Sequence, residues 1–509
     1  MTRTHRFLNG FASGYVHLIV AAVVGLWLTP FFLRRLGADT YGLWLLGTQI
    51  IAYLLLMDFG VVALLPREAA YVTGRTGSQD APELQRLIEK ALTLAVAQTP
   101  FVVIAATAAW YWFPSAWSGL RTPLFVVLAV FIVTFPLRVF QAALTGLQDL
   151  AFVARAQFAA WAIGTVVNVW LVLHGYALSA LAAGWCATQL LVVLSCGVRL
   201  ARGLPGAMPR RLRIGDRTSV RDYLARSAWI SVSQVSQVLL NGTDVMIVAA
   251  LLGPAAVVPY ACTGKLVAVL ANQPQAILQS AAPALSELRT AGDRARLFTV
   301  SAALAQATLA VSGLVACVVV AINAGFVTWW VGPEQFGGMG LTLLLLGAMM
   351  IRHFNTTNVY ALFCFGHERR LALTGLADGF ATLVLSAALV GLFGLAGAPL
   401  GAIAGVVLVG GPLNIAALSR ETGVEPHRLV TVLGPWFWRF FVMIAIAGLT
   451  GAWLRPSTFP VLALLGASAG LLYSLVVVTP LLRSPAGPYL RRLKGIVTFK
   501  GDSPLSATR

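Results

Sequence analysis

The chain has 509 residues, of which 58% are hydrophobic and only 11% are charged, and its mean hydropathy is +0.82. Soluble globular domains carry about 25% charged residues, so a chain this apolar cannot cover itself with a polar shell and must be solvated largely by lipid. The net charge of +18 would suit a nucleic-acid partner, but the apolar stretches recur too regularly to leave a soluble basic domain, and we expect no nucleic-acid binding.

Apolar stretches long enough to cross a bilayer run through the whole chain, since roughly 20 residues suffice for one span. The stretch from Phe11 to Leu33 follows Arg3 and Arg6 and lacks a clean small-residue cleavage site, so it is interpreted as the first span and not as a signal peptide. The sequence predicts an all-α polytopic membrane protein with about fourteen transmembrane helices, at 11–32, 42–65, 88–113, 122–147, 153–173, 177–198, 227–250, 256–282, 298–322, 339–364, 370–392, 397–418, 435–454 and 459–482.

The distribution of positive charge supports this even count. Cytoplasmic loops of membrane proteins are enriched in Lys and Arg. With the N-terminus in the cytoplasm, 28 of the 36 Lys and Arg residues fall in cytoplasmic segments, whereas the outer loops hold only Arg34, Arg35, Arg121 and Arg455. A missed helix would invert every later loop and destroy this bias, so we predict that both termini are cytoplasmic.

A weak internal repeat divides the predicted helices. Leu36-Gly37 matches Leu252-Gly253 at an offset of 216 residues, the stretch 178–184 matches 399–405 at 221, and Arg138 precedes Arg352 by 214. Six helices per copy make the copies parallel, which suits two lobes moving about a central cavity. We predict an N-lobe, a basic cytoplasmic linker lying on anionic headgroups, a C-lobe, a further helix pair and a basic cytoplasmic tail, at 1–198, 199–226, 227–418, 419–482 and 483–509.

Three short motifs carry a resemblance to a known family. They are the run Arg34-Arg-Leu-Gly-Ala-Asp-Thr-Tyr-Gly-Leu-Trp44, Met57-Asp-Phe-Gly60 in the second predicted helix, and Asn241-Gly-Thr-Asp244 before the repeated turn. In order and spacing they resemble the polysaccharide and O-antigen flippases of the multidrug/oligosaccharidyl-lipid/polysaccharide exporter superfamily, to which the lipid II flippase also belongs. The resemblance extends over essentially the whole chain.

The resemblance implies a bacterial inner-membrane protein for cell-surface polysaccharide biosynthesis. Its substrate would be an undecaprenyl-pyrophosphate-linked oligosaccharide, moved from the cytoplasmic to the periplasmic leaflet by alternating access, beside other polysaccharide-assembly membrane proteins. The alternative is a sodium- or proton-coupled multidrug exporter of the same superfamily, for which twelve helices and fewer cationic groups in the cavity are expected.

Charged residues inside the predicted spans are candidates for function, because a charge in hydrocarbon costs about 2.5–3.5 kcal/mol on insertion scales. If the repeat is genuine, Arg138 and Arg352 lie at similar depth in opposite lobes. Guanidinium groups bind pyrophosphate oxygens in bidentate fashion, so this pair suits the substrate. The alternative is that each arginine caps carbonyls or pairs with a carboxylate in its own lobe.

Asp244 and Lys265 flank the same outer turn, each about 12–15 Å below it at 1.5 Å per residue. They form either a structural ion pair or a pair that substrate or ion binding breaks. If Lys265 faces the cavity, it is expected to be a third phosphate contact. Asp58, Asp244 and Asp378 are candidates for ion coupling or gating, although Asp58, near a helix end, suits a solvated or capping role equally well.

The aromatic residues Trp436, Phe437, Trp438, Phe440 and Phe441 crowd the start of the thirteenth predicted helix. The resemblance to the lipid II branch implies a groove for a lipid tail here, and the alternative is an interfacial aromatic belt.

The sequence contains only incomplete matches to the motifs of phosphate-binding enzymes and metal sites. Gly264-Lys265 has Pro259 where a phosphate-binding loop needs its first glycine, and His367-Glu368 has Leu371 in place of a second histidine. The five cysteines form no C-x-x-C pair. We therefore expect no catalysis, no metal and no cofactor, with any energy input coming from a sodium, proton or substrate gradient.

Overall fold

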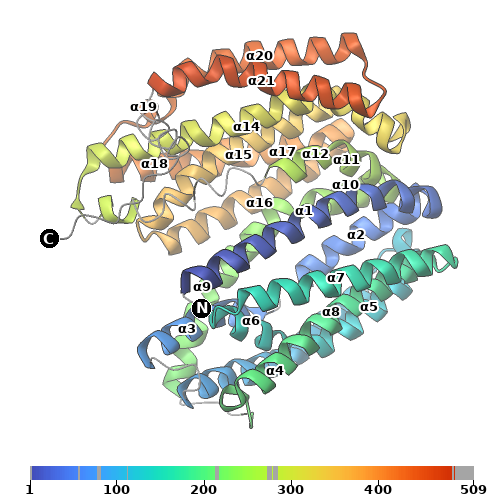
Figure 1. Ribbon diagram of the computed structural model, residues 1–509, viewed down its shortest axis with the longest axis vertical. Coiled ribbons are helices and arrows are strands. Elements are labelled where there is room, and N and C mark those ends of the chain that lie inside the picture. The colour runs from blue at the N-terminus through green and yellow to red at the C-terminus, as the bar shows by residue number, and fades with distance from the viewer. Residues whose placement is uncertain are drawn as a thin grey trace, which may run out of the picture. The chain divides into compact units, whose positions relative to one another are not determined.

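The computed structural model describes residues 3–54, 58–76, 82–111, 113–212, 217–271, 278, 285–289, 291–483 and 487. Within these ranges the chain is helical and no residue lies in a strand, as predicted for an all-α membrane protein. The chain divides into two compact units, Met1–Val258 and Pro259–Arg509. Figure 1 shows the helices of each unit.

The described residues of unit 1 form ten α-helices. Its core lies among α3, α4, α5, α6 and α8, whose buried side chains include Leu65, Ile88 and Phe131. The helices are α1 (Arg3–Leu36), α2 (Ala38–Leu54), α3 (Val61–Thr76), α4 (Pro82–Tyr111), α5 (Arg121–Thr134), α6 (Arg138–Gly146), α7 (Leu150–Leu173), α8 (Ala177–Gly203), α9 (Arg217–Asn241) and α10 (Thr243–Leu252), with short 3₁₀ helices at Ser115–Leu120, Pro205–Ala207 and Pro254–Ala256.

Unit 2 is organised around one long helix, α14 (Arg294–Val331), against which α15, α20 and α21 pack. α20 and α21, orange-red in Figure 1, also run side by side. The other elements are α11 (Val257–Thr263), which begins at the boundary, α12 (Lys265–Leu270), α15 (Met339–Cys364), α16 (Glu368–Phe393), α17 (Gly397–Gly405), a π-helix (Val406–Gly410), α18 (Gly411–Thr422), α19 (Pro426–Thr431), α20 (Gly434–Leu454) and α21 (Phe459–Arg483), with 3₁₀ helices at Pro333–Gln335 and Gly394–Ala396.

Several predicted spans are interrupted. The span expected at 122–147 is divided between α5 and α6, because Pro136 has no N–H to continue the helical hydrogen-bond ladder. The span expected at 42–65 breaks between α2 and α3, and that at 256–282 breaks at Gly264, between α11 and α12. The span at 227–250 breaks at Gly242, and the one at 397–418 contains the π-helix. Each break frees backbone groups at membrane depth, where only neighbouring protein can satisfy them.

The chain is a multi-pass membrane protein. Among the described residues, eight helices are long and apolar enough to cross a bilayer, or nine if α9 and α10 together make one bent span. The count of fourteen stays a prediction, because the shorter pieces of interrupted spans do not meet that length. The lobe boundaries also stay a prediction. The compact units group α9 and α10 with the first eight helices, whereas the repeat places them at the start of the second copy.

Candidate functional site

Asp58 occupies the break between α2 and α3. The residue is 1% exposed, so it is buried and not solvated. Its Oδ1 accepts a hydrogen bond of 3.0 Å from the Gly60 amide, and the carboxylate also binds the Ala63 amide. Phe59 and Gly60 have φ angles of 43° and 70°, so the backbone passes through the left-handed region just before α3 begins. Asp58 therefore holds the turn that starts α3, which agrees with the capping alternative.

Arg138 is the first residue of α6 and owes its position to the Pro136 break. α6 packs on α3, and the Arg138 guanidinium and the Asp58 carboxylate attract each other electrostatically. The Nη1 atom of Arg138 is buried, and no described residue accepts a hydrogen bond from it. A buried donor without an acceptor is rare because its desolvation is not compensated. This guanidinium can therefore take a further anionic oxygen.

Arg352, in the middle of α15, lies beside Asp378 of α16. Its Nη1 is 3.9 Å from Asp378 Oδ2, and its Nη2 donates a 3.2 Å hydrogen bond to Thr382 Oγ1. The side chains are 19% and 2% exposed, so the carboxylate of this ion pair is buried and the guanidinium is partly buried. Pairing with a carboxylate of the same unit was the alternative role for this arginine. Its predicted contact with substrate stays a prediction.

The backbone of the π-helix and of the residue before it passes close to Asp378. A methyl group placed at Gly410 would lie 2.4 Å from Asp378 Oδ2, and one at Gly405 would lie 3.1 Å from Oδ1, so only glycines let this backbone approach the carboxylate. Asn414 Nδ2 donates a 3.0 Å hydrogen bond to Asn355 Oδ1, and both residues are buried. π-helical turns of this kind are frequent at functional sites.

The buried amides and Thr382 were missed by the sequence reasoning, which considered only charged residues. A usable signal was present, because Gly405 and Gly410-Gly411 lie five residues apart in one predicted span. Asn355 also follows Arg352 by three residues, the spacing that places two side chains on one helix face.

Lys265 begins α12, directly after the Gly264 break. The break is held by buried polar residues of unit 2: Asn323 Nδ2 donates to the Thr263 carbonyl at 3.0 Å and to Thr342 Oγ1 at 2.9 Å. Lys265 itself is partly buried. Asp244, in the first turn of α10, belongs to unit 1 and Lys265 to unit 2. The predicted pair between them stays a prediction.

The aromatic residues at the start of α20 divide into two sets. Trp436 and Phe440 are 4% and 6% exposed, and the Trp436 indole Nε1 donates a 2.9 Å hydrogen bond to the Tyr473 hydroxyl of α21. In contrast, Phe437, Trp438 and Phe441 are at least half exposed. The first set is packing core, and the second faces the surroundings as a belt or a lipid-tail surface would.

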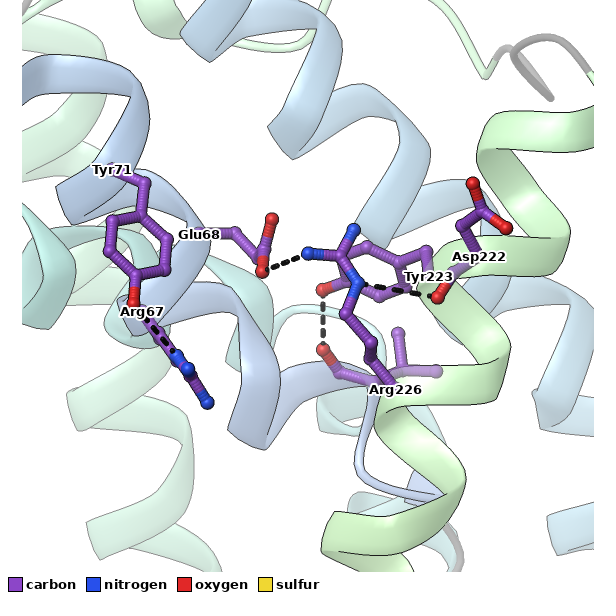
Figure 2. Close-up of polar contacts among 7 residues, drawn as sticks. Arg67, Glu68, Tyr71, Asp222, Tyr223 and Arg226 are labelled. Atoms are coloured by element: carbon purple, nitrogen blue, oxygen red, sulfur yellow. Dashed lines mark hydrogen bonds and ion pairs between the residues drawn. The ribbon is translucent and has the colours of Figure 1, made fainter. Parts of the chain in front are cut away.

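A polar contact between α3 and α9 was also missed (Figure 2). The Arg226 guanidinium donates to Glu68 Oε1 at 2.7 Å, and the Tyr223 hydroxyl donates to the Val61 carbonyl at 2.8 Å. These partners are more than 150 residues apart, so no local spacing could have revealed them.

The basic linker is anchored in its described part. The Arg210 amide donates to Glu89 Oε1 at 3.0 Å, and Gln85 Nε2 donates to the Met208 carbonyl at 3.2 Å. Side chains of α4 thus bind the backbone of residues 208–210, so this part of the linker packs against unit 1.

Comparisons with known proteins agree with this architecture. Residues 90–332 match the family described as "Polysaccharide biosynthesis protein". A relative in Bacillus subtilis (strain 168), the uncharacterized membrane protein EpsK, is 22% identical over 452 residues, which are 84% of this chain and 86% of the relative.

Two solved structures share the fold. The lipid II flippase MurJ in an inward closed conformation superposes with a TM-score of 0.60 at 11% identity, covering 92% of this chain and 99% of that one. An inward-facing multidrug resistance MATE transporter of the MOP superfamily gives a TM-score of 0.57 at 13% identity, covering 80% and 96%. The chain thus shares the fold of these two transporters, and its residues 90–332 are similar to the polysaccharide biosynthesis family.

Proposed function

We propose that this chain is a flippase for an undecaprenyl-pyrophosphate-linked oligosaccharide, moving it from the cytoplasmic to the periplasmic leaflet by alternating access. The match to a polysaccharide biosynthesis family supports the glycan part of the proposal, and the fold shared with the lipid II flippase supports a lipid-linked substrate. The observation that carries the proposal is the Arg138 guanidinium, whose buried Nη1 has no acceptor among the described residues.

A pyrophosphate linkage suits this arginine chemically. It presents several anionic oxygens, which bind guanidinium groups through strong charge-assisted hydrogen bonds, and these gain strength where water is excluded. The oligosaccharide is polar and needs an aqueous path, whereas the undecaprenyl chain stays in lipid. The charged linkage is therefore the part of the substrate that the membrane resists most, and a buried cation lowers that barrier.

The surroundings of Arg352 suit a mechanism in which substrate binding is coupled to the binding of a proton or a sodium ion. Because Asp378 and Thr382 already bind it, a pyrophosphate oxygen must compete with the carboxylate for the guanidinium. Loss of the arginine would leave Asp378 buried beside neutral amides and glycines, where it would take up a proton or a sodium ion. The substrate would then bind Arg352 while the coupling ion binds Asp378, so that each replaces the ion pair between the two residues. Lys265 would be a further phosphate contact.

The proposal is tested in cells that lack the protein, by measuring lipid-linked glycan in each leaflet with a membrane-impermeant glycan-labelling reagent. We expect the glycolipid to accumulate on the cytoplasmic side, and Arg138→Ala to behave like the deletion at normal protein levels. Arg439→Ala is the matched control, because Arg439 also lies in a predicted span but stacks on Trp438. Normal delivery in the deletion strain would refute the proposal.

A second candidate, export of drugs coupled to sodium or protons, is favoured by the fold shared with the MATE transporter and by the buried Asp378. It predicts that the deletion strain accumulates cationic drugs while its glycolipid remains normally distributed. The same strain therefore separates the two functions.

A further inference from the structure

Two polar contacts set the register between α14 and α15. Asn323 Nδ2 of α14 donates to Thr342 Oγ1 of α15 at 2.9 Å. Ser312 Oγ of α14 lies 2.7 Å from His353 Nδ1 of α15. Ser312 lies eleven residues before Asn323, and His353 lies eleven residues after Thr342. The two helices are therefore antiparallel in one constant register, and the stretch before Ser312 packs along the stretch after His353.

His353 connects α14 to the end of α12. Ser312 is fully buried, and its hydroxyl donates to the Thr308 carbonyl at 2.8 Å. The His353 ring also hydrogen-bonds the backbone of Ala271. Because the Ala271 amide already donates to the Val267 carbonyl, the carbonyl of Ala271 is the group that accepts from the ring. With Nδ1 facing Ser312, this second bond uses Nε2.

These contacts satisfy the ring in two protonation states. In the neutral ring, Nε2 donates to Ala271 and the Ser312 hydroxyl donates to Nδ1. In the cation, Nδ1 donates to the Ser312 oxygen, and the hydroxyl turns its hydrogen to the Thr308 carbonyl. A hydroxyl makes this change by rotation, because it can both donate and accept. The ring can therefore gain and lose one proton without leaving either nitrogen unpaired.

No carboxylate among the described residues forms a hydrogen bond or an ion pair with His353. Asp378 of α16 is bound by Arg352, and Lys265 of α12 disfavours a second positive charge. The cation therefore depends on Ser312 and Ala271. Among the described residues, the titratable groups inside α15 and the helices packed on it, apart from those near the helix starts and the end of α18, are Lys265 of α12, Cys317 of α14, Arg352, Tyr360 and Cys364 of α15, and Asp378 of α16.

A line of buried hydroxyls leads from His353 toward the start of α14. Thr308 and Ser301 lie four and eleven residues before Ser312, on the same face of the helix. They are 1% and 3% exposed, and no described residue binds Thr308 Oγ1 or Ser301 Oγ. On the stretch of α15 that follows His353, Asn358 Nδ2 is also buried without a partner. Buried polar atoms of this kind are satisfied by water, so the line suits a row of water molecules about 16 Å long.

We propose that His353 is a proton-binding site of unit 2 and that this line of hydroxyls supplies its proton. A hydronium ion in the line gives a proton to the Ser312 oxygen, the original Ser312 hydrogen passes to Nδ1, and a water molecule remains. The proton enters from the start of α14, which is predicted to be cytoplasmic. The site itself does not depend on the proposed function. Only the use of the bound proton to drive glycolipid transfer rests on that function.

The first test observes the ring by nitrogen NMR in the purified full-length protein with isotopically labelled histidine, without glycolipid. The chain has six histidines, and the signals lost in His353→Gln are those of His353. We expect them to change reversibly from the cation to the neutral Nε2–H form as the pH rises between about 5 and 8. A ring that keeps one state throughout, or a neutral ring with its hydrogen on Nδ1, would overturn the proposal.

Ser312→Ala removes the oxygen that accepts from the cation. We expect the proton affinity of His353 to fall about tenfold, which moves the titration midpoint about one pH unit lower, because a hydrogen bond to a charged group is lost. Ser474→Ala is the matched control, since the Ser474 hydroxyl of α21 also donates to a carbonyl of its own helix, at 2.7 Å. Its midpoint should stay unchanged. Equal midpoints in the two variants would overturn the proposed site.

Thr308→Val removes one hydroxyl from the line and keeps the size of the side chain. We expect the Nδ1 proton to exchange with solvent about tenfold more slowly, as the loss of about one hydrogen bond along the path implies. Thr299→Val is the control, because Thr299 is an exposed residue of the same helix. Equally fast exchange in both variants would overturn the supply of the proton along α14.

If the bound proton drives transport, a pH gradient across liposomes should change the rate of glycolipid transfer by the unaltered chain but not by His353→Gln. A gradient effect that persists in His353→Gln would overturn this use of the site. Absence of transfer in the unaltered chain, together with normal titration of His353, would instead refute the proposed function, while the proton site stands.

Discussion

Arg352 illustrates how a single charge is kept inside an apolar helix. Its guanidinium is bound by Asp378 and Thr382, so the charge is compensated within one unit. Arg138 differs, because its Nη1 has no acceptor among the described residues. The two arginines were predicted as equivalent members of a repeat, yet their surroundings differ, since one lies in mid-helix and the other follows a proline break.

Removing one partner of the Arg352–Asp378 pair should lower the free energy of unfolding more than removing both. Asp378→Ala leaves Arg352 buried without its carboxylate, and losses of about 3–5 kcal/mol are typical of such changes. The double variant Arg352→Met, Asp378→Leu leaves no charge behind and should be more stable than the single variant. Thermal unfolding in detergent measures both, and a double variant less stable than Asp378→Ala would contradict this account.

Trp436 offers a sharper comparison, because a second tryptophan lies two residues away. Trp436→Phe leaves the Tyr473 hydroxyl buried without its donor, which should cost about 1–3 kcal/mol. Trp438 is 57% exposed, so Trp438→Phe should change the melting temperature little. Equal melting temperatures for the two variants would show that the α20–α21 contact does not depend on this hydrogen bond.

At the scale of the helices, the sequence predicted most boundaries well, because long apolar runs must be helical in lipid. α15 runs over Met339–Cys364, as expected, and α21 ends within one residue of its prediction. The interruptions were not predicted, since a window of about 20 residues averages over a break. Pro136 and Gly264 marked two of them, but whether a proline or glycine breaks a membrane helix depends on neighbours that can satisfy the freed backbone.

Partners across helices were the least predictable part of the candidate site. Asp58, Arg138, Arg352 and Asp378 could be named from the sequence because a charge is conspicuous in an apolar run. Their neighbours Thr382, Asn355 and Asn414 look like ordinary polar residues of membrane helices. Only the packing of α15, α16 and α18 brings those neighbours together.

The π-helix gives a prediction at this scale. Gly410→Ala places a methyl group 2.4 Å from Asp378 Oδ2, so the carboxylate must shift, and overpacking of this kind costs about 1–3 kcal/mol. We expect lower thermal stability and impaired transport. Gly391→Ala in α16 is the control, because nothing lies within 4 Å of its new methyl group. Equal stability of the two variants would mean that Asp378 is not confined by the π-helix.

At the scale of the whole molecule, the orientation rests on the charge distribution and can be measured directly. We predict that a cysteine at Ser457, in the exposed turn between α20 and α21, reacts with an impermeant maleimide in intact cells. A cysteine at Arg211 in the basic linker should react only after the membrane is permeabilised. The reverse pattern would contradict the predicted topology. The unaltered chain measures the background labelling of the native cysteines, which should be low because four of the five are buried.

The central claim is that the protein moves a lipid-linked glycan across the bilayer with Arg138 bearing the charge of the linkage. The direct measurement is the transfer of undecaprenyl-pyrophosphate-linked oligosaccharide between leaflets of liposomes that contain the purified protein. We predict transfer by the unaltered chain and by Arg439→Ala, and loss of at least about tenfold in Arg138→Ala, equivalent to about 1.4 kcal/mol. Transfer at the rate of protein-free liposomes, or full transfer by Arg138→Ala, would contradict the account.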